Sequence, residues 1–266
     1  MPDPHTIDLL IPTRGRPSSL KPLLKNIRDT ASEPKNITAC FWADRDDPDT
    51  GKAAQAAKEE LEESFREIIV LNGDRQGIAD VYNEMSSWVN GDLIGYLADD
   101  VEFRTDGWDE KVCEAFGEFP DRIVLVHLFD PARPKDEQFP DHGFISRWAK
   151  MCLKYVFPVF PPHPDVVNAV GISFTDIWLS PLYDLLDRRK HLPDVILKHR
   201  HWCSRGDGTE ADAELDDNYV EHAITSKWRK TEEFTVRIAE LPQHAETLKK
   251  FIRWAEGGGL ERIQYE

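Results

Sequence analysis

Two adjacent carboxylates, Asp99 and Asp100, interrupt an apolar run that extends from residue 93 to residue 103. The run predicts a buried strand, with both acids at the sheet edge where open α/β folds bind ligands. Neighbouring carboxylates repel each other unless a cation lies between them, and Mg²⁺ and Mn²⁺ both accept oxygen ligands and often bridge carboxylate to phosphate. The alternative is that the two acids only cap the next turn.

Arginines and a further acid follow the other strands predicted in the first part of the chain. Arg14 and Arg16 lie in the turn after the first strand, Asp44 follows the second, and Arg75 follows the third. Guanidinium groups and backbone N–H groups beside a helix N-terminus can bind phosphate, although the basic turn alone is also compatible with a solvated loop. Because parallel strands end at the same edge, we expect these side chains to converge on the Asp99–Asp100 pair.

Later in the chain, Asp176 lies among large apolar residues, and His199 and His201 follow a short predicted strand at 195–198. A carboxylate in apolar surroundings is either paired or has a raised pKa, which suits a general base. It could instead cap the helix predicted from residue 179. The H-x-H spacing would point both imidazoles to one side and suits a metal ion, with a surface pair as the alternative.

The composition of the 266-residue chain, 40% hydrophobic and 31% charged, is typical of a soluble globular protein with one large domain. The sequence has no apolar run of membrane-spanning length, and its N-terminus leaves no room for a signal peptide before the first strand. The net charge of −16 argues against binding nucleic acid or an anionic membrane by charge alone. The four cysteines are widely spaced, which predicts reduced thiols in a cytoplasmic protein.

Strand and helix alternate three times before Asp99, which predicts a parallel sheet with right-handed crossovers. The expected order is strand 6–11, helix 18–29, strand 35–42, helix 49–66, strand 67–71 and helix 78–89. After residue 103 we expect helix 107–116, strand 123–127, a surface loop 130–142, helix 143–155, an extended segment 157–164 and a helix 218–226. A last helix, 243–255, has one apolar face, which would pack on the domain or on a second subunit.

Four segments resemble the GT-A-fold glycosyltransferases of the family 2 type. They are Leu-Leu-Ile-Pro-Thr-Arg-Gly-Arg-Pro at 9–17, Phe-Trp-Ala-Asp at 41–44, Asn-Gly-Asp-Arg-Gln-Gly-Ile at 72–78 followed by Asn83, and Tyr-Leu-Ala-Asp-Asp-Val at 96–101. The last resembles the strand that carries the D-x-D motif of that family, although Ala98-Asp99-Asp100 stands in place of a strict D-x-D. The resemblance covers about the first 110 residues well and the remainder in outline.

The resemblance implies a mostly parallel, Rossmann-like central sheet with flanking helices and a C-terminal helical extension. Residues 1–110 would form the nucleotide-sugar-binding half, residues 111–230 the acceptor-binding half, and residues 231–266 the extension. It also implies Mn²⁺ or Mg²⁺ at Asp100 with His199 and His201, and Asp176 as the base for the acceptor hydroxyl. The residues expected to contact the donor nucleotide are Pro12, Thr13, Arg14, Arg16, Asp44, Arg75, Gly77, Asn83 and Asp99, the last at the ribose or beside the metal's ligands.

The implied activity is transfer of a hexosyl or pentosyl group from a nucleotide-diphosphate sugar, with inversion at the anomeric carbon. The acceptor could be a saccharide, a small molecule or a hydroxymethylated DNA base of the phage type, and the net charge argues against a duplex. Two other classes remain open: a metal-dependent phosphohydrolase or nucleotidyltransferase, and a non-catalytic nucleotide-binding protein. The C-terminal helix could also form a homodimer.

Overall fold

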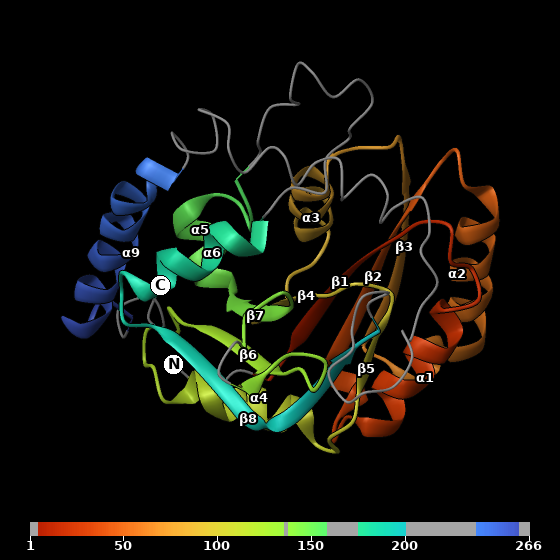
Figure 1. The fold of residues 1–266 in the computed structure, drawn as a ribbon, viewed down its shortest axis with the longest axis horizontal. Coiled ribbons are helices and arrows are strands. Elements are labelled where there is room, and N and C mark those ends of the chain that lie inside the picture. The colour runs from red at the N-terminus through yellow and green to blue at the C-terminus, as the bar shows by residue number, and fades with distance from the viewer. Residues whose placement is uncertain (1–4, 136–137, 159–174, 201–237, 261–266) are drawn as a thin grey trace.

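A computed structural model describes residues 5–135, 138–158, 175–200 and 238–260, with the side chains of 175–177 excluded. The described strands form one eight-stranded sheet in the order β3-β2-β1-β4-β7-β6-β8-β5. Helices cover both faces of this sheet, as Figure 1 shows. The predicted α/β class is confirmed. None of the helices in these ranges is long and apolar enough to cross a membrane.

The first half of the sheet is parallel, as the alternation of strands and helices predicts. β1 lies between β2 and β4, and β3 pairs with the outer side of β2, all in parallel. The strands are β1 (Ile7–Thr13), β2 (Ile37–Asp44), β3 (Glu67–Gly73) and β4 (Leu93–Tyr96), and the connecting helices are α1 (Leu20–Thr30), α2 (Pro48–Leu61) and α3 (Ile78–Ser87). Short 3₁₀ turns, η1 (Pro34–Asn36) and η2 (Glu62–Ser64), precede β2 and β3.

The second half of the sheet is mixed. β7 runs antiparallel to both β4 and β6, whereas β8 is parallel to β6 and antiparallel to β5. These strands are β5 (Val101–Phe103), β6 (Leu125–Phe129), β7 (Gly143–Ser146) and β8 (Arg189–His199). β8 therefore brings its end at His199 beside the start of β5, directly after the Asp99–Asp100 pair.

Several boundaries differ from the sequence prediction. The segment 143–155 is not one helix: its first four residues form β7, and Ser146 then caps α5 (Arg147–Leu153) by accepting a hydrogen bond from the N–H of Ala149 at 3.1 Å. Glycine fits at position 143 of this strand, because a Cβ there would lie 2.7 Å from the Tyr96 hydroxyl. The predicted strand 93–103 turns at its two acids and splits into β4 and β5. At the start of α2 the cap is Asp47, which accepts from the N–H of Thr50.

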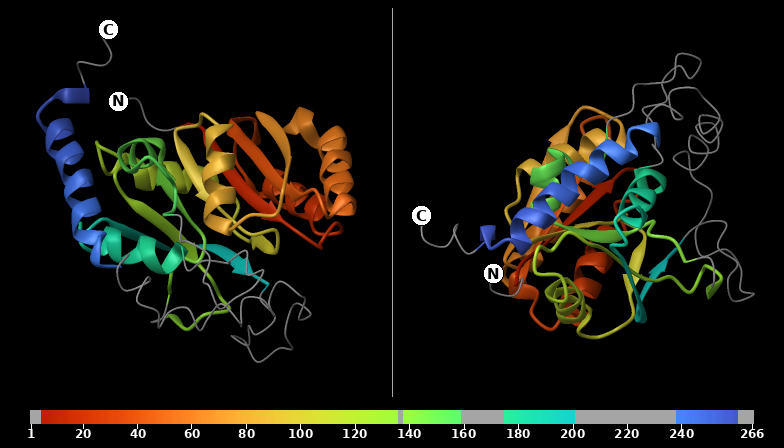
Figure 2. Two further views of the ribbon diagram at one scale, coloured as in Figure 1. Left: turned by 90° about the horizontal axis from the view of Figure 1, so that it is seen from above. Right: turned by 90° about the vertical axis from the view of Figure 1, so that its left-hand side faces the viewer.

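The hydrophobic core has one layer on each face of the sheet. Helices α1, α2 and α4 (Trp108–Gly117) cover one face, and α3, α5, α6 (Thr175–Asp184) and α9 (Leu241–Glu256) cover the other. Figure 2 shows α9 beside α5 and α6, onto which it packs. Its buried residues are Leu241, Ala245, Leu248 and Ile252. The apolar face of this C-terminal helix therefore packs on its own domain.

Candidate active site

The carboxyl ends of β1 and β4 are joined by a short hydrogen bond between buried side chains. The Thr13 hydroxyl donates to Oδ2 of Asp99 at 2.6 Å. Both residues are buried: Thr13 ends β1, and Asp99 lies three residues after the end of β4. The structure thus places Thr13 and Asp99 together at the sheet edge, as the sequence predicts.

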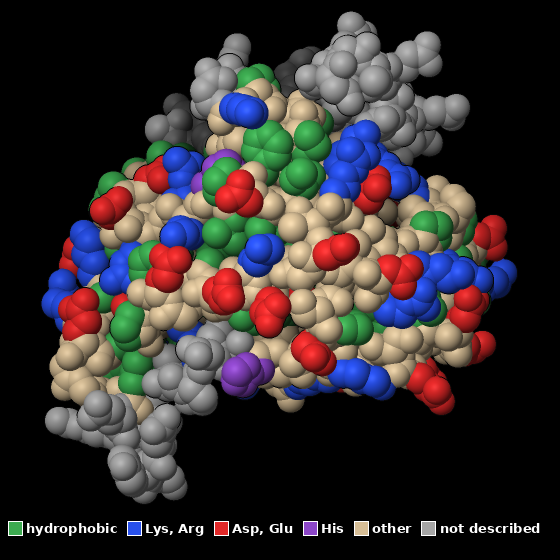
Figure 3. Space-filling model, turned by 90° about the horizontal axis from the view of Figure 1, so that it is seen from below, with side chains coloured by type: hydrophobic (Ala, Val, Ile, Leu, Met, Phe, Trp, Pro, Cys, Tyr) green, Lys and Arg blue, Asp and Glu red, His purple; other side chains and the backbone are tan. Residues whose placement is uncertain are grey.

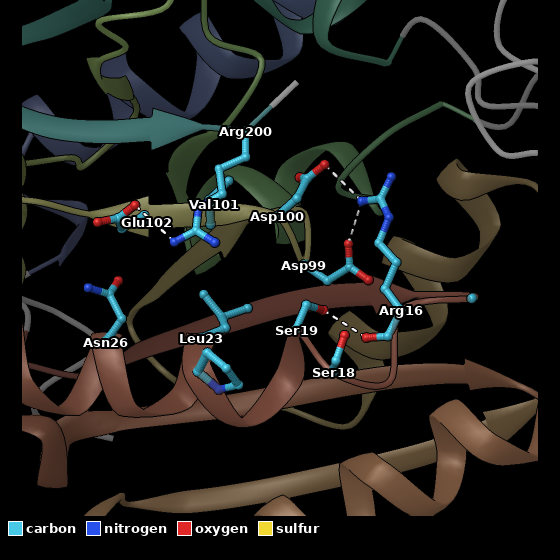
Figure 4. Close-up of a pocket in the computed structure, with 12 residues that line it drawn as sticks. Arg16, Ser18, Ser19, Leu23, Asn26, Asp99, Asp100, Val101, Glu102 and Arg200 are labelled. Atoms are coloured by element: carbon cyan, nitrogen blue, oxygen red, sulfur yellow. Dashed lines mark hydrogen bonds and ion pairs between the residues drawn. The ribbon is translucent and has the colours of Figure 1, made fainter. Parts of the chain in front are cut away.

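A guanidinium group lies between the two adjacent carboxylates. Nη1 of Arg16 is 2.8 Å from Oδ1 of Asp99 and 2.8 Å from Oδ2 of Asp100, as Figure 4 shows. Burial raises the pKa of Asp99 to about 6, with the charge of Arg16 opposing this shift and the charge of Asp100 adding to it. The positive group that the paired acids require is therefore supplied by the protein's own basic turn.

The other arginine of that turn contacts the end of β2. Nη1 of Arg14 lies 2.9 Å from Oδ2 of Asp44 and 2.5 Å from Oδ1 of Asp46. The indole N–H of Trp42 donates to the second oxygen of Asp44 at 3.1 Å. The hydrogen bond from Arg14 lowers the pKa of Asp46. Asp44, predicted to contact a nucleotide base, is thus held in one orientation by two donors.

The remaining residues predicted around the nucleotide lie at the same edge. Pro12 is in register with Trp42 on β2, and Gly77 occupies the N-cap position of α3. Arg75 lies in the turn between β3 and α3 and acts electrostatically on Asp46. The carboxyl ends of β1, β2 and β3 therefore form one continuous polar edge.

Asn83 has a structural contact that the sequence does not reveal. Its Nδ2 donates to the carbonyl of Phe157 at 2.8 Å, and its Oδ1 accepts from the N–H of Val156 at 2.8 Å. The Phe157 ring in turn packs against Tyr82 and Tyr96. Asn83 therefore fixes the segment after α5 against α3, and its predicted contact with the donor stays a prediction.

His199, at the end of β8, reaches the acidic pair. Its Nε2 is 3.2 Å from Oδ1 of Asp100. Burial lowers the pKa of His199, but the hydrogen bond and charge of Asp100, with the charges of Asp130 and Asp141, raise it overall. Two of the predicted metal ligands, Asp100 and His199, are thus adjacent.

Two other predicted residues cannot be placed in the same detail. His201 lies outside the described residues, and so does the side chain of Asp176. The backbone of Asp176 is in the first turn of α6. The roles predicted for both residues stay predictions.

Three residues missed by the sequence analysis lie beside His199. Asp130 follows β6, whereas Asp141 and His142 precede β7. Ligand atoms of Asp130, Asp141 and His199 all lie within 4.8 Å of one another. The rings of His142 and His199 meet edge to face with centroids 4.6 Å apart, and burial, followed by the charge of His199, lowers the pKa of His142 to about 3. The only available signal was that acids lie at both ends of the predicted loop 130–142.

A pocket of about 410 Å³ opens next to the paired acids. The first turn of α1 forms one wall and β5 with Arg200 forms the other, as Figure 4 shows. Arg200 closes its far side by an ion pair with Glu102 at 3.0 Å. Asp99 and Asp100 both line this pocket.

The sequence matches a known family, and the fold matches solved structures. The model of glycosyl transferase family 2 matches residues 8–168, more than half of the chain. No sequence among curated proteins matches. Among solved structures, the mannosyltransferase PcManGT from Pyrobaculum calidifontis in complex with GDP-Man and Mn²⁺ aligns with a TM-score of 0.59 and 13% identity, over 96% of this chain and 76% of that one.

A second solved structure has the same fold. S. aureus TarS 1–349 in complex with UDP-GlcNAc aligns with a TM-score of 0.53 and 13% identity, over 96% of this chain and 74% of that one. Identities this low establish the GT-A fold alone, whereas the family match covers β1 to β7 and the polar edge built on them. The chain therefore belongs to glycosyl transferase family 2 and is a glycosyltransferase.

Proposed function

We propose that the protein transfers a sugar from a nucleotide-diphosphate sugar to an acceptor hydroxyl, in a metal-dependent reaction that inverts the anomeric carbon. The observation that carries this proposal is the cluster of Arg16, Asp99, Asp100 and His199 at the ends of β1, β4 and β8. Such a cluster combines cationic and metal-binding groups where a leaving diphosphate develops charge.

The donor would bind in the half formed by residues 1–110. PcManGT and TarS were solved with GDP-Man and UDP-GlcNAc respectively, which supports a nucleotide sugar as the donor class. Asp44 would accept from the base, and Thr13 and Asp99 would lie at the ribose. Arg14 and Arg75 would donate charge-assisted hydrogen bonds to the diphosphate.

A divalent cation fits the donor set around Asp100. A carboxylate and an imidazole with 3.2 Å between Oδ1 and Nε2 are ligands that Mn²⁺ accepts, and Mg²⁺ is the alternative. Asp100 and His199 would hold this cation, together with His201. When bound, it supplies Lewis-acid neutralisation of charge on the diphosphate.

Residues 111–230 would bind the acceptor, and Asp176 would take the proton of its hydroxyl during attack on the anomeric carbon. A single displacement of this kind inverts that centre. On the face drawn in Figure 3, acidic and basic side chains of the described residues are interspersed. With a net charge of −16, this favours a saccharide or small molecule over duplex DNA as the acceptor.

The test is a thermal-shift and donor-hydrolysis screen of nucleotide sugars, with Mn²⁺ and with EDTA. A nucleotide diphosphate at ~100 times its Kd should stabilise the protein by ~2.7 kcal/mol, and only when Mn²⁺ is present. Asp100→Asn should abolish that metal dependence, whereas Asp106→Asn, at an exposed carboxylate after β5, should retain it. If no nucleotide raises the Tm under either condition, the proposal is wrong.

The same screen separates the other two classes. A phosphohydrolase or nucleotidyltransferase would cleave or transfer the nucleotide without moving the sugar to an acceptor. A non-catalytic binding protein would show the same slow donor hydrolysis before and after Asp176→Ala. The transferase predicts a loss of sugar transfer in that variant while nucleotide binding persists.

A further inference from the structure

Three neighbouring strands bring a second set of ligand groups to the predicted metal site. Asp130 directly follows β6, Asp141 lies two residues before β7, and His199 ends β8. Their ligand atoms lie within 4.8 Å of one another, which is close enough for one ion to contact all three. Asp100 adjoins this set through His199.

Asp130 and Asp141 each have one carboxylate oxygen that accepts a hydrogen bond from the protein. Oδ1 of Asp130 accepts from the backbone N–H of Ala132 at 2.9 Å, and Oδ2 of Asp141 accepts from Nε of Arg133 at 2.6 Å. Within the described residues, the second oxygen of each carboxylate has no hydrogen-bond partner. The carboxylates are therefore oriented by one oxygen, which leaves the other available as a ligand.

His142 gives an independent indication that a group is bound here. Both of its ring nitrogens are shielded from solvent, and neither has a hydrogen-bond partner in the described part of the chain. Its ring contacts that of His199, and the charges of Asp100 and Asp141 act on it. Buried polar atoms without partners are rare because each costs free energy. A ligand bound at this place would supply the missing partner.

We infer that Asp130 and Asp141 bind a divalent cation together with His199, in addition to the predicted ligand Asp100. The inference deepens the proposed function, because it assigns further ligands to the cation of that reaction. Two carboxylates with an imidazole suit Mn²⁺ better than Mg²⁺, which favours a shell of oxygen and water. The cation then binds the protein before any nucleotide, and it links the loop 130–142 to the donor edge.

The test is a titration of the full chain with Mn²⁺ alone, in which the EPR signal of free Mn²⁺ measures binding. Asp130→Asn and Asp141→Asn should each raise the Kd for Mn²⁺ by about tenfold or more, on the scale seen when metal-site residues are replaced. Asp194→Asn, at an exposed carboxylate on the same strand as His199, is the matched control and should leave the Kd unchanged. Thermal unfolding in EDTA establishes that each variant is folded.

Pulsed EPR of Mn²⁺ bound to the wild-type protein gives a readout that needs no carboxylate variant. It should show coupling to imidazole nitrogen, and His199→Gln should remove the part of this coupling that comes from His199. Wild-type affinity in both Asn variants, or the absence of nitrogen coupling, overturns the inference.

The nucleotide screen and the Mn²⁺ titration together distinguish failure of this inference from failure of the proposed function. Mn²⁺-dependent nucleotide stabilisation with wild-type Mn²⁺ affinity in the Asn variants refutes this inference and leaves the proposed function intact. Loss of Mn²⁺ binding in those variants, without any nucleotide stabilisation of the wild-type protein, supports the cation site and refutes the proposed function.

Discussion

A buried histidine away from the active site, stacked on a partly exposed one, should make the protein sensitive to mild acid. His127 on β6 lies opposite His191 on β8, and their rings stack with centroids 4.7 Å apart. Burial, followed by the charge of His191, lowers the pKa of His127 to about 3. The native protein therefore keeps His127 neutral at pH values where the unfolded chain protonates it.

The sign and size of the effect follow from proton linkage. Below the unfolded pKa of about 6.5, the unfolded chain binds more protons than the native one, so the stability falls as the pH falls. Each pH unit costs about 1.4 kcal/mol per histidine, so that lowering the pH from 6.5 to 5.0 removes about 2 kcal/mol. Stability continues to fall until the pH reaches the native pKa of His127, about 3.

The perturbation is His127→Phe, which keeps an aromatic ring against His191 and removes the titrating group. Urea unfolding of both proteins at pH 7.5 and pH 5.0 gives two differences in the free energy of unfolding. The free energy of unfolding of the variant minus that of the wild type should be about 2 kcal/mol larger at pH 5.0 than at pH 7.5. This holds even if the substitution destabilises the protein at pH 7.5. Titrating groups that do not interact with His127 cancel in this comparison. His5→Gln, which replaces an exposed histidine, should show the same pH dependence of the free energy of unfolding as the wild type.

Parallel pH profiles for the wild type and His127→Phe would refute the reasoning. They would mean that the native protein protonates His127 as easily as the unfolded chain does. In that case the ring must have a solvent path or a hydrogen-bond acceptor, contrary to its 3% exposure and its unpartnered Nδ1 among the described residues.

Three further variants test the packing around the site. Arg16→Met removes the cation between the two carboxylates and should lower the free energy of unfolding in EDTA by about 2–3 kcal/mol, with Mn²⁺ restoring part of the Tm. Asn83→Ala should cost about 2 kcal/mol in urea unfolding, because it leaves backbone groups at Val156 and Phe157 unpaired. Gly95→Ala places a Cβ 2.8 Å from the Phe144 ring and should lower the Tm by overpacking, at a cost of about 1–3 kcal/mol.

The first half of the sheet could be predicted from the sequence because its signals are local. Apolar runs separated by helical patterns indicate β1 to β4, and parallel strands must end at one edge. That rule alone places Thr13, Asp44 and Asp99 together, and the structure does so. His199 entered the predicted site through the family resemblance, because the H-x-H pattern alone also fits a surface pair.

The second half could not be predicted because it depends on pairing between distant strands. The four residues of β7 also fit the helical pattern that continues into α5, and only the insertion of β7 between β4 and β6 selects a strand. Without that insertion, Asp130 and Asp141 belong to a proline-rich loop with no defined neighbours. Their proximity to His199 is a product of the sheet order, which local patterns do not encode.

The sequence also does not show that the two arginines of the basic turn already have acidic partners. Arg16 is bound to Asp99, whose side chain is 5% exposed, whereas one partner of Arg14 is Asp46, whose side chain is 57% exposed. Exposed ion pairs contribute little to stability, but breaking a buried one leaves an uncompensated charge. A phosphate would therefore displace Asp46 from Arg14 more easily than it would displace Asp99 from Arg16. Arg14 is thus suited to exchange partners with a donor, and Arg16 to hold the carboxylate pair in place.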